Sequence, residues 1–131
     1  MITTNKYLIN LERLTESILI VSIFDKKTKI LTEKMPMNSL YDILNALFYL
    51  IEYNGSFDIQ LPANNTQYGY TFYGGRSASH PGLFQLLLVR QDFGSGNDYM
   101  IADEFLEYYE IKNILNDISI FDNESIIITK I

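Results

Sequence analysis

One segment with helical periodicity, bordered by segments of alternating polarity, limits most strongly what this chain of 131 residues can fold into. Apolar side chains recur there at steps of three and four residues, the spacing of one face of an α-helix. This stripe consists of Leu40, Ile43, Leu44, Leu47, Phe48 and Ile51. Asn38 or Ser39 is suited to cap the first turn, and Asn54 followed by Gly55 favours a left-handed stop. The pattern therefore predicts an amphipathic helix between these signals.

Six other segments have the composition or the alternation of β-strands. They are residues 17–24, 29–34, 57–61, 68–73, 83–89 and 125–131. The first two are predicted to form a hairpin around the polar turn 25–28, and the nearly continuous apolar segment 83–89 is predicted to lie centrally in the sheet. Residues 93–97, which contain two glycines, predict a loop, whereas residues 8–14 fit either a strand or a short helix.

A second helix is predicted between residues 102 and 118, where apolar residues again form a stripe. This stripe consists of Phe105, Tyr108, Ile111, Leu115 and Ile118. The order of elements favours an α+β fold: a largely antiparallel sheet of about five to six strands with two helices packed on one face. No repeat or linker divides the sequence, and its length suits a single globular domain over residues 1–131.

The composition, with 47% hydrophobic and 20% charged residues, is that of an ordinary globular chain. The absence of cysteine excludes disulfides and thiolate metal sites, and it fits a reducing compartment. The apolar segments are far shorter than the ~20 residues that a membrane span needs, and the N-terminus lacks a signal-peptide pattern. We therefore expect a cytoplasmic protein without membrane contact, in the host cytoplasm if a phage or virus encodes it.

Charge is distributed unevenly along the chain. Residues 91–125 contain nine acidic residues and one basic residue, a net charge of −8, whereas the whole chain carries −6. Such a concentration of one sign repels nucleic acid and attracts cationic surfaces, over a Debye length of about 8 Å at physiological salt. The sequence therefore predicts a basic protein partner and no direct nucleic-acid binding. Four lysines of the first hairpin form too small a basic footprint to change this prediction: Lys26, Lys27, Lys29 and Lys34.

Within the acidic region, Glu104, Glu107 and Glu110 lie three residues apart and would share one face of the predicted second helix. Exposed ion pairs contribute little affinity, so this face would mainly steer association, and tyrosines would supply the anchors. The predicted partner-binding residues are Asp98, Tyr99, Asp103, Glu104, Glu107, Tyr108 and Glu110. This interpretation favours a small inhibitor or immunity-type protein that docks on a nuclease or another enzyme that handles nucleic acid. The alternative is an ordinary solvated helix face.

A second hypothesis concerns the glycine-rich segment 68–82, the one place where aromatic, small and cationic residues gather. Glycine lets backbone N–H groups converge on an anion, arginine can grip a phosphate or carboxylate, and tyrosine can stack on a flat ring. The predicted ligand-binding residues are Tyr70, Tyr73, Arg76, Ser77, Ser79 and His80. The protein would then hold an anionic or nucleotide-like ligand, as a homodimer. A plain surface loop explains the same glycines, and a subunit of a larger particle is a third hypothesis.

Signatures of catalysis are weak. His80 is the only histidine, no nucleophile elbow is present, and Ser79 would not face His80 on an extended backbone. Neither a phosphate-loop ending nor a calcium-loop spacing occurs in the sequence. We therefore expect a non-enzymatic binding protein with no catalytic residue, no metal and no cofactor.

Overall fold

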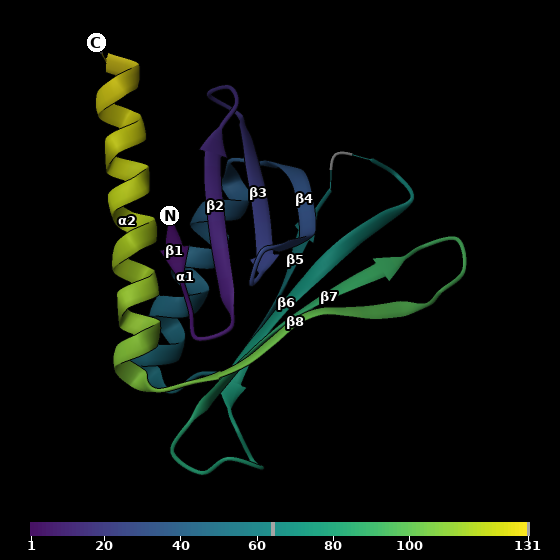
Figure 1. The fold of residues 1–131 in the computed structure, drawn as a ribbon, viewed down its shortest axis with the longest axis vertical. Helices are drawn as coiled ribbons and strands as arrows, with labels where there is room; N and C mark the ends of the chain where they lie inside the picture. The colour runs from purple at the N-terminus through teal and green to yellow at the C-terminus, as the bar shows by residue number, and fades with distance from the viewer. Residues whose placement is uncertain (64, 131) are drawn as a thin grey trace.

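The structure, a computed structural model, describes residues 1–63 and 65–130, and within these ranges the side chains as far as residue 123. Over these residues it contains two four-stranded antiparallel sheets and two helices (Figure 1). The first sheet consists of β1 (Ile2–Thr3), β2 (Tyr7–Arg13), β3 (Ile18–Asp25) and β4 (Thr28–Pro36), and α1 (Asn38–Tyr53) follows it. The second sheet consists of β5 (Phe57–Pro62), β6 (Tyr68–Arg76), β7 (Phe84–Asp92) and β8 (Asp98–Leu106), and α2 (Tyr108–Lys130) follows it.

The α+β class and the antiparallel pairing are confirmed, but the number of strands and sheets differs from the prediction. Eight strands in two meanders replace the predicted sheet of five to six strands. The inner faces of both sheets contribute to one buried apolar cluster. The helix α1 packs against α2 and against strands of both sheets, so the two helices do not simply cover one face of one sheet.

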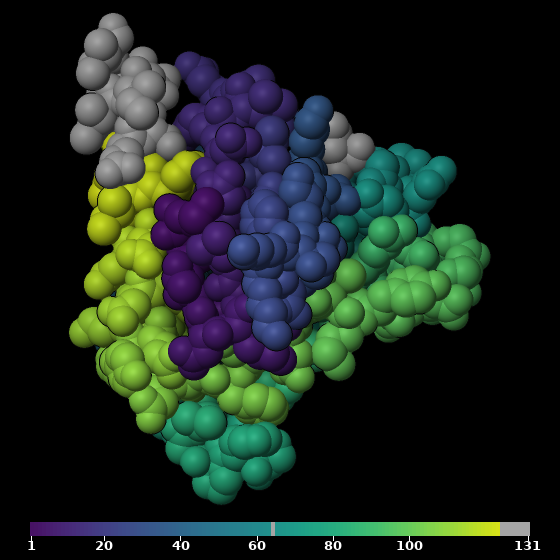
Figure 2. Space-filling view, viewed as in Figure 1, coloured from purple at the N-terminus to yellow at the C-terminus, as the bar shows by residue number. Residues whose placement is uncertain are grey.

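The first hairpin forms as predicted, with β3 and β4 paired around a turn in which Lys26 has a left-handed φ of 57°. Residues 8–14, which fitted either a strand or a helix, largely belong to β2. The strand forms because β2 pairs with β3 along its whole length, from Tyr7 opposite Asp25 to Arg13 opposite Leu19. In Figure 2 this sheet occupies the middle of the visible surface, between α2 and the projecting end of the second sheet.

The predicted first helix is confirmed as α1, and Asn54 ends it in the left-handed conformation with a φ of 52°. Its start differs from the prediction, because the N-cap residue is Met37, and Asn38 and Ser39 lie inside the first turn. No side chain caps this end of the helix. The side chain of Met37 is buried, so packing in the core determines where the helix begins.

The strand β7 lies between β6 and β8, which confirms the central position predicted for residues 83–89. Residues 93–97 lie in the predicted connection, where Gly96 has a φ of 73°. The strands of the second sheet continue beyond the first sheet. The β7–β8 hairpin therefore projects from the body of the molecule on the side away from α2 (Figure 1).

The predicted second helix is wrong over its first part, because residues 98–106 form β8 and α2 begins only at Tyr108. The strand pairs with β7, and Ala102, Glu104 and Leu106 point alternately toward the interior. This hairpin pairing with β7 overrides the helical spacing of the carboxylates. The predicted C-terminal strand at residues 125–131 is also wrong as far as Lys130, where α2 ends, and residue 131 lies outside the described residues.

The core lies between the two sheets and under the inner faces of the helices. Its most completely buried members include Leu19 of β3, Leu50 of α1, Leu106 of β8 and Ile111 of α2. Both halves of the chain therefore supply the same core. As far as the structure describes them, neither helix has an apolar stretch that could cross a membrane.

Candidate functional site

The outer face of α1 carries a concentration of exposed aromatic side chains. Tyr41, Phe48, Tyr49 and Tyr53 lie on this face, and between 40% and 70% of each residue is exposed. Together with three polar neighbours they form what we call the α1 surface: Tyr41, Asp42, Asn45, Phe48, Tyr49, Glu52 and Tyr53. Single exposed apolar side chains are ordinary, but clusters of them are typical of interaction sites.

Three of the four aromatic rings of the α1 surface, those of Phe48, Tyr49 and Tyr53, support one another. The ring centroid of Tyr53 lies 5.8 Å from that of Tyr49 and 6.5 Å from that of Phe48, the second pair edge to face. Gly55 follows the helix and leaves space for the ring of Tyr49, because a Cβ atom at this position would overlap that ring. The rings are therefore partly held in place by one another, and a preorganised surface of this kind loses less entropy when it binds.

The helical layer is acidic. The helix α1 has two carboxylates, Asp42 and Glu52, and no basic residue. The helix α2 packs beside it, and Tyr41 donates a hydrogen bond of 3.4 Å to Oδ1 of Asp122 across the two helices. As far as residue 123, α2 contributes three carboxylates and one lysine: Glu110, Asp117, Asp122 and Lys112. The described part of the two helices thus carries a net charge of −4, which favours cationic partners.

The α1 surface was missed in the sequence because Phe48 was assigned to the buried stripe of the helix. In the structure Phe48 lies at the border of that stripe and is 48% exposed. The available signal was the recurrence of Tyr41, Tyr49 and Tyr53 at steps of eight and four residues. Periodicity shows which side of a helix is more apolar, but it does not show whether another layer covers the aromatic side.

The seven residues predicted to bind a partner do not share one helix face. Asp98 and Tyr99 lie at the projecting end of β8, Asp103 and Glu104 farther along that strand, and Glu107, Tyr108 and Glu110 around the start of α2. At about 3.4 Å per residue, the nine steps from Asp98 to Glu107 extend over about 30 Å. The prediction that these carboxylates share one helix face is therefore wrong, because they do not form a single patch.

Two of the predicted carboxylates serve contacts within the fold. Glu104 is only 5% exposed, and its Oε1 accepts a hydrogen bond of 2.9 Å from the backbone N–H of Lys6. Oδ1 of Asp103 accepts a hydrogen bond of 2.8 Å from Nε2 of Gln85. Glu104 thereby fastens the turn between β1 and β2 to β8, and it is not presented to a partner.

Glu107, Tyr108 and Glu110 do remain together at the exposed start of α2. The backbone N–H of Glu107 donates a hydrogen bond of 3.0 Å to Oε1 of Glu110, which satisfies one donor at the helix end. Tyr109 lies beside these carboxylates, and Glu110, followed by Glu107, raises the pKa of its phenol. This small cluster is the part of the predicted site that the structure brings together.

The six residues predicted to hold a ligand are also divided. Tyr70 and Tyr73 are three positions apart on β6, so their side chains lie on opposite faces of the sheet. Tyr70 is buried in the core and donates a hydrogen bond of 3.0 Å to Oε1 of Glu33. Tyr73 lies on the outer face. The two tyrosines therefore cannot flank one ligand.

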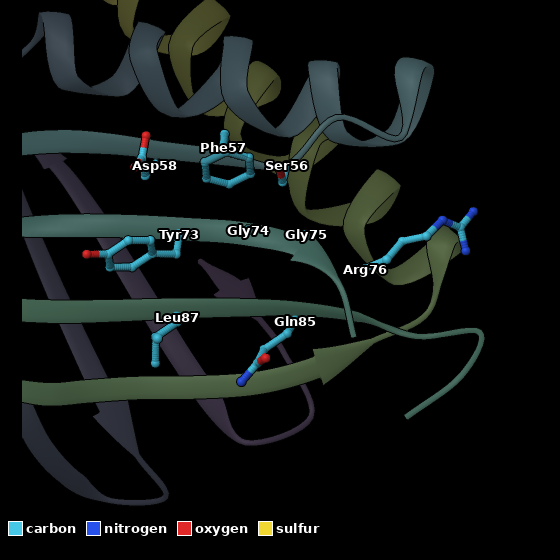
Figure 3. Close-up of a pocket in the computed structure, with 9 residues that line it drawn as sticks. All are labelled: Ser56, Phe57, Asp58, Tyr73, Gly74, Gly75, Arg76, Gln85 and Leu87. Carbon is cyan, nitrogen blue, oxygen red and sulfur yellow. The ribbon is translucent and has the colours of Figure 1, made fainter. Parts of the chain in front are cut away.

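A hollow of about 390 Å³ lies on the outer face of the second sheet (Figure 3). Its walls include Asp58, Tyr73, Gly75, Gln85 and Leu87. The guanidinium of Arg76 extends away from the other labelled side chains (Figure 3). Its Nη2 donates a hydrogen bond of 2.9 Å to Oδ1 of Asn54, and its central carbon lies 5.0 Å from the ring centroid of Phe84. Arg76 is thus engaged by the fold at the rim of this hollow.

Ser77, Ser79 and His80 form a network of their own in the exposed loop after β6. The Oγ atom of Ser79 lies 2.9 Å from Nδ1 of His80 and 3.2 Å from Oγ of Ser77. The expectation that Ser79 would not face His80 is wrong, because the backbone bends here and is not extended. The ring of His80 also packs on Phe105, with centroids 4.0 Å apart. These contacts hold the loop over β8, away from Tyr70.

A partly buried polar cluster joins the two sheets. Oε1 of Glu33 accepts hydrogen bonds of 2.6 Å from Tyr68 and 3.0 Å from Tyr70. Burial, followed by the bond to Glu33, raises the pKa of Tyr70, and the bond to Glu33 is the main cause that raises the pKa of Tyr68. Arg90 lies 3.9 Å from the ring centroid of Tyr68 and pairs with Asp92 at 2.8 Å. The cluster fastens β4 to β6 and has the character of a structural contact.

Within the residues that the structure describes, no three His, Cys, Asp or Glu side chains gather in a way that could hold a metal ion. No protein-family model, curated protein or solved structure matches this chain.

Proposed function

We propose that this protein acts by stoichiometric, non-catalytic binding of a basic protein through the α1 surface. The observation that carries the proposal is a set of four neighbouring aromatic side chains, each 40–70% exposed, on a helix with two carboxylates and no basic residue. Aromatic residues are enriched at the centres of protein interfaces, where they act as anchors. The acidic surroundings select a partner of positive charge.

The rings and the carboxylates contribute to binding in different ways. Truncation of an anchor residue typically weakens binding by about 2 kcal/mol or more, whereas an exposed ion pair contributes only about 0–1 kcal/mol. The aromatic rings would therefore determine how long the complex lasts. Asp42 and Glu52 would mainly accelerate association, and this contribution weakens as salt screens the charges.

An inhibitor or immunity-type function fits this kind of surface. Enzymes that handle nucleic acid bind phosphates through basic surfaces, and an acidic protein can occupy such a surface in place of the nucleic acid. The partner is therefore proposed to be a nuclease or another nucleic-acid-binding enzyme. Its activity should fall in proportion to the amount of this protein added, until the two are present in equal amounts.

The proposal is tested by capturing partners at low salt with the wild-type protein and with the double variant Phe48→Ala/Tyr49→Ala. Tyr109→Ala is the matched control, because Tyr109 is similarly exposed but lies on α2. We expect the wild type and the control to retain one basic protein in a one-to-one complex. The double variant should bind it at least about 30-fold more weakly, in line with the loss of one strong anchor.

Two results would contradict the proposal. One is an equal dissociation constant for the wild type and for Phe48→Ala/Tyr49→Ala, which would remove the α1 surface from the interface. The other is an acidic partner, or binding that is unaffected when salt rises from low to physiological levels. Either finding would remove the electrostatic argument, because exposed charges are screened over about 8 Å at physiological salt.

A second candidate function is favoured by the hollow beside Tyr73, whose volume of about 390 Å³ is in the range of small-molecule sites. In this alternative the protein, as a homodimer, holds an anionic or nucleotide-like ligand, with Tyr73 stacked on it and Arg76 turned from Asn54 toward it. Arg76→Ala should abolish binding of a nucleotide in calorimetry and leave protein capture unchanged. Equal nucleotide binding by wild type and variant would reject this alternative.

A further inference from the structure

A cavity of about 140 Å³, partly open to the outside, lies between the inner faces of the two sheets. Its lining comes from both halves of the chain, since strands of each sheet and both helices contribute to it. Apolar members of the lining include Ile9, Val21, Leu47, Leu86, Leu88 and Ile114. The cavity is distinct from the α1 surface and from the hollow of the second sheet, which both lie on the outside.

Polar side chains of the described lining are confined to one end of the cavity, where the β1–β2 turn meets β8. There, Oγ1 of Thr4 accepts a hydrogen bond of 2.9 Å from the backbone N–H of Tyr7. The hydroxyl of Tyr7 accepts one of 3.2 Å from the backbone N–H of Asp103, and Glu104 accepts one from Lys6. These groups already have partners within the fold, so the cavity presents mainly hydrocarbon to an occupant.

The size and the lining together limit what can occupy this space. A water molecule inside a protein needs about two to four polar partners, which this lining does not offer over most of its surface. Closed apolar cavities of about 150 Å³ take up molecules such as benzene or xenon, and the apolar lining here favours the same kind of occupant. An occupant of that kind restores dispersion contacts that the atoms around an empty cavity lack.

We propose that this cavity is a binding site for a small, uncharged, apolar molecule no larger than benzene. The occupant contacts side chains of both halves of the chain, for example Leu47 of the first and Ile114 of the second. Binding therefore stabilises the packing of one sheet against the other. Charged molecules are excluded, because transferring them into a hydrocarbon lining without new hydrogen bonds is strongly unfavourable.

The wild-type protein tests the proposal through its amide NMR spectrum, recorded under xenon pressure and separately in benzene-saturated buffer. We expect saturable shifts concentrated at residues that line the cavity, such as Leu47, Leu88 and Ile114, together with a higher midpoint of thermal unfolding. Three results would each overturn the proposal. They are no change in the amide chemical shifts, changes that rise linearly with ligand without saturating, and changes confined to the α1 surface.

Two alanine positions provide a matched pair of variants. Ala102 lines the cavity, and Ala102→Leu adds three carbon atoms there, so this variant should lose the saturable response. Ala78 lies in the exposed loop after β6, and Ala78→Leu should respond as the wild type does. An unchanged response of Ala102→Leu would overturn the proposal.

If Ala102→Leu does not fold, Leu47→Ala tests the same cavity by enlarging it. Removing three carbon atoms from the lining should admit a larger apolar ring system, and indole is the probe of choice. We expect indole to cause saturable changes in the amide chemical shifts of Leu47→Ala and no changes in those of the wild type. A variant that folds and takes up no indole would contradict the proposal.

Discussion

The two halves of the chain have the same order of elements but present different surfaces. Each half is a four-stranded antiparallel meander followed by a helix. On the inside the helices are alike, because Leu50 of α1 and Ile111 of α2 are both completely buried. On the outside they differ, because α1 exposes aromatic rings from its first turn to its last. The exposed tyrosines of α2, Tyr108 and Tyr109, lie only at its start, and polar residues such as Asn113 and Asp117 follow them. The inner faces build the fold, and the difference between the outer faces is the basis on which we propose a partner site on α1.

The two halves also do not close completely on each other. A partly open cavity of about 140 Å³ remains between them, and the atoms that line it lack part of the dispersion contacts that close packing would give. Small domains are stable by only about 5–15 kcal/mol in total. A ligand that fills this cavity should therefore shift the folding equilibrium measurably, even if its contacts are individually weak.

The largest expected effects test whether the inner faces of the two helices are equivalent. Leu50→Ala and Ile111→Ala should each lower the free energy of unfolding by about 2–5 kcal/mol, because each removes packed side-chain atoms from the core. Chemical denaturation measures both changes. Phe48→Ala, on the outer face of α1, should cost less than about 1 kcal/mol. A large loss in one half only would show that the halves are not equally important for the core.

A smaller effect tests the polar contact that joins the halves. Glu33→Ala should lower the free energy of unfolding by about 1–3 kcal/mol, because it leaves the buried hydroxyl of Tyr70 without its acceptor. Glu33→Gln retains an acceptor and should cost less. Glu12→Ala removes an exposed carboxylate of the first sheet and serves as the control. Equal losses for Glu33→Ala and Glu12→Ala would show that the contact does not stabilise the junction.

Alkaline pH tests the same junction. The pKa of Tyr70 in the folded chain is raised above its ordinary value of 10.0 by burial and by Glu33. Below pH 10 the proton is bound in both states. As pH rises above 10, the unfolded chain releases it and the folded chain keeps it, so the free energy of unfolding falls. Denaturation curves from about pH 9 to about pH 11 measure this fall.

Tyr70→Phe should flatten the alkaline fall in stability, because the variant has no phenol proton to retain at this position. Tyr53→Phe, on the α1 surface, is the matched control and should keep the slope of the wild type. If both variants show the wild-type slope, Tyr70 does not contribute to the pH dependence of folding.

The smallest expected effect concerns the end of the helix in the first half. Asn54 has a φ of 52°, in the left-handed region. Residues with a Cβ atom are strained there, but asparagine tolerates this conformation better than most. Asn54→Ala should cost about 1 kcal/mol, whereas Asn54→Gly should cost less, because glycine adopts this conformation without strain. Both variants lose the hydrogen bond from Arg76, so their difference isolates the backbone. An equal loss in the free energy of unfolding for both variants would show that the left-handed conformation of residue 54 does not stabilise the C-terminal end of α1.

The predictions that are confirmed rest on sequence patterns that act over short distances along the chain. The helix α1, the first hairpin, the strands around residues 57–61 and 68–73, and the loop 93–97 follow from patterns within a few neighbouring residues. Residues 98–106 carry carboxylates at helical spacing, and this local pattern wrongly predicted that the second helix begins there. Those residues form β8 because β7 offers a complete edge to pair with, and sequence spacing does not contain that information. The number of sheets likewise depended on which neighbouring strands pair with each other.

The candidate site shows the same limit. The acidic character of the chain was visible in the composition, and the proposal of a basic partner starts from it. The assignment of Glu104 to the binding face was wrong, since this side chain is buried against the β1–β2 turn. The exposure of Phe48 was equally hidden, because it depends on where neighbouring layers stop.

By itself, then, the sequence determined the α+β class, the helix α1, most of the strands and the sign of the charge, because periodicity, turn chemistry and composition act locally. Tertiary structure alone decided that there are two sheets, that α1 keeps an aromatic face exposed, and that a cavity remains between the halves. Each of these depends on which surfaces meet in space. Burial is a property of the packed layers, and the same tyrosine can be a core residue or an anchor for a partner according to what lies above it.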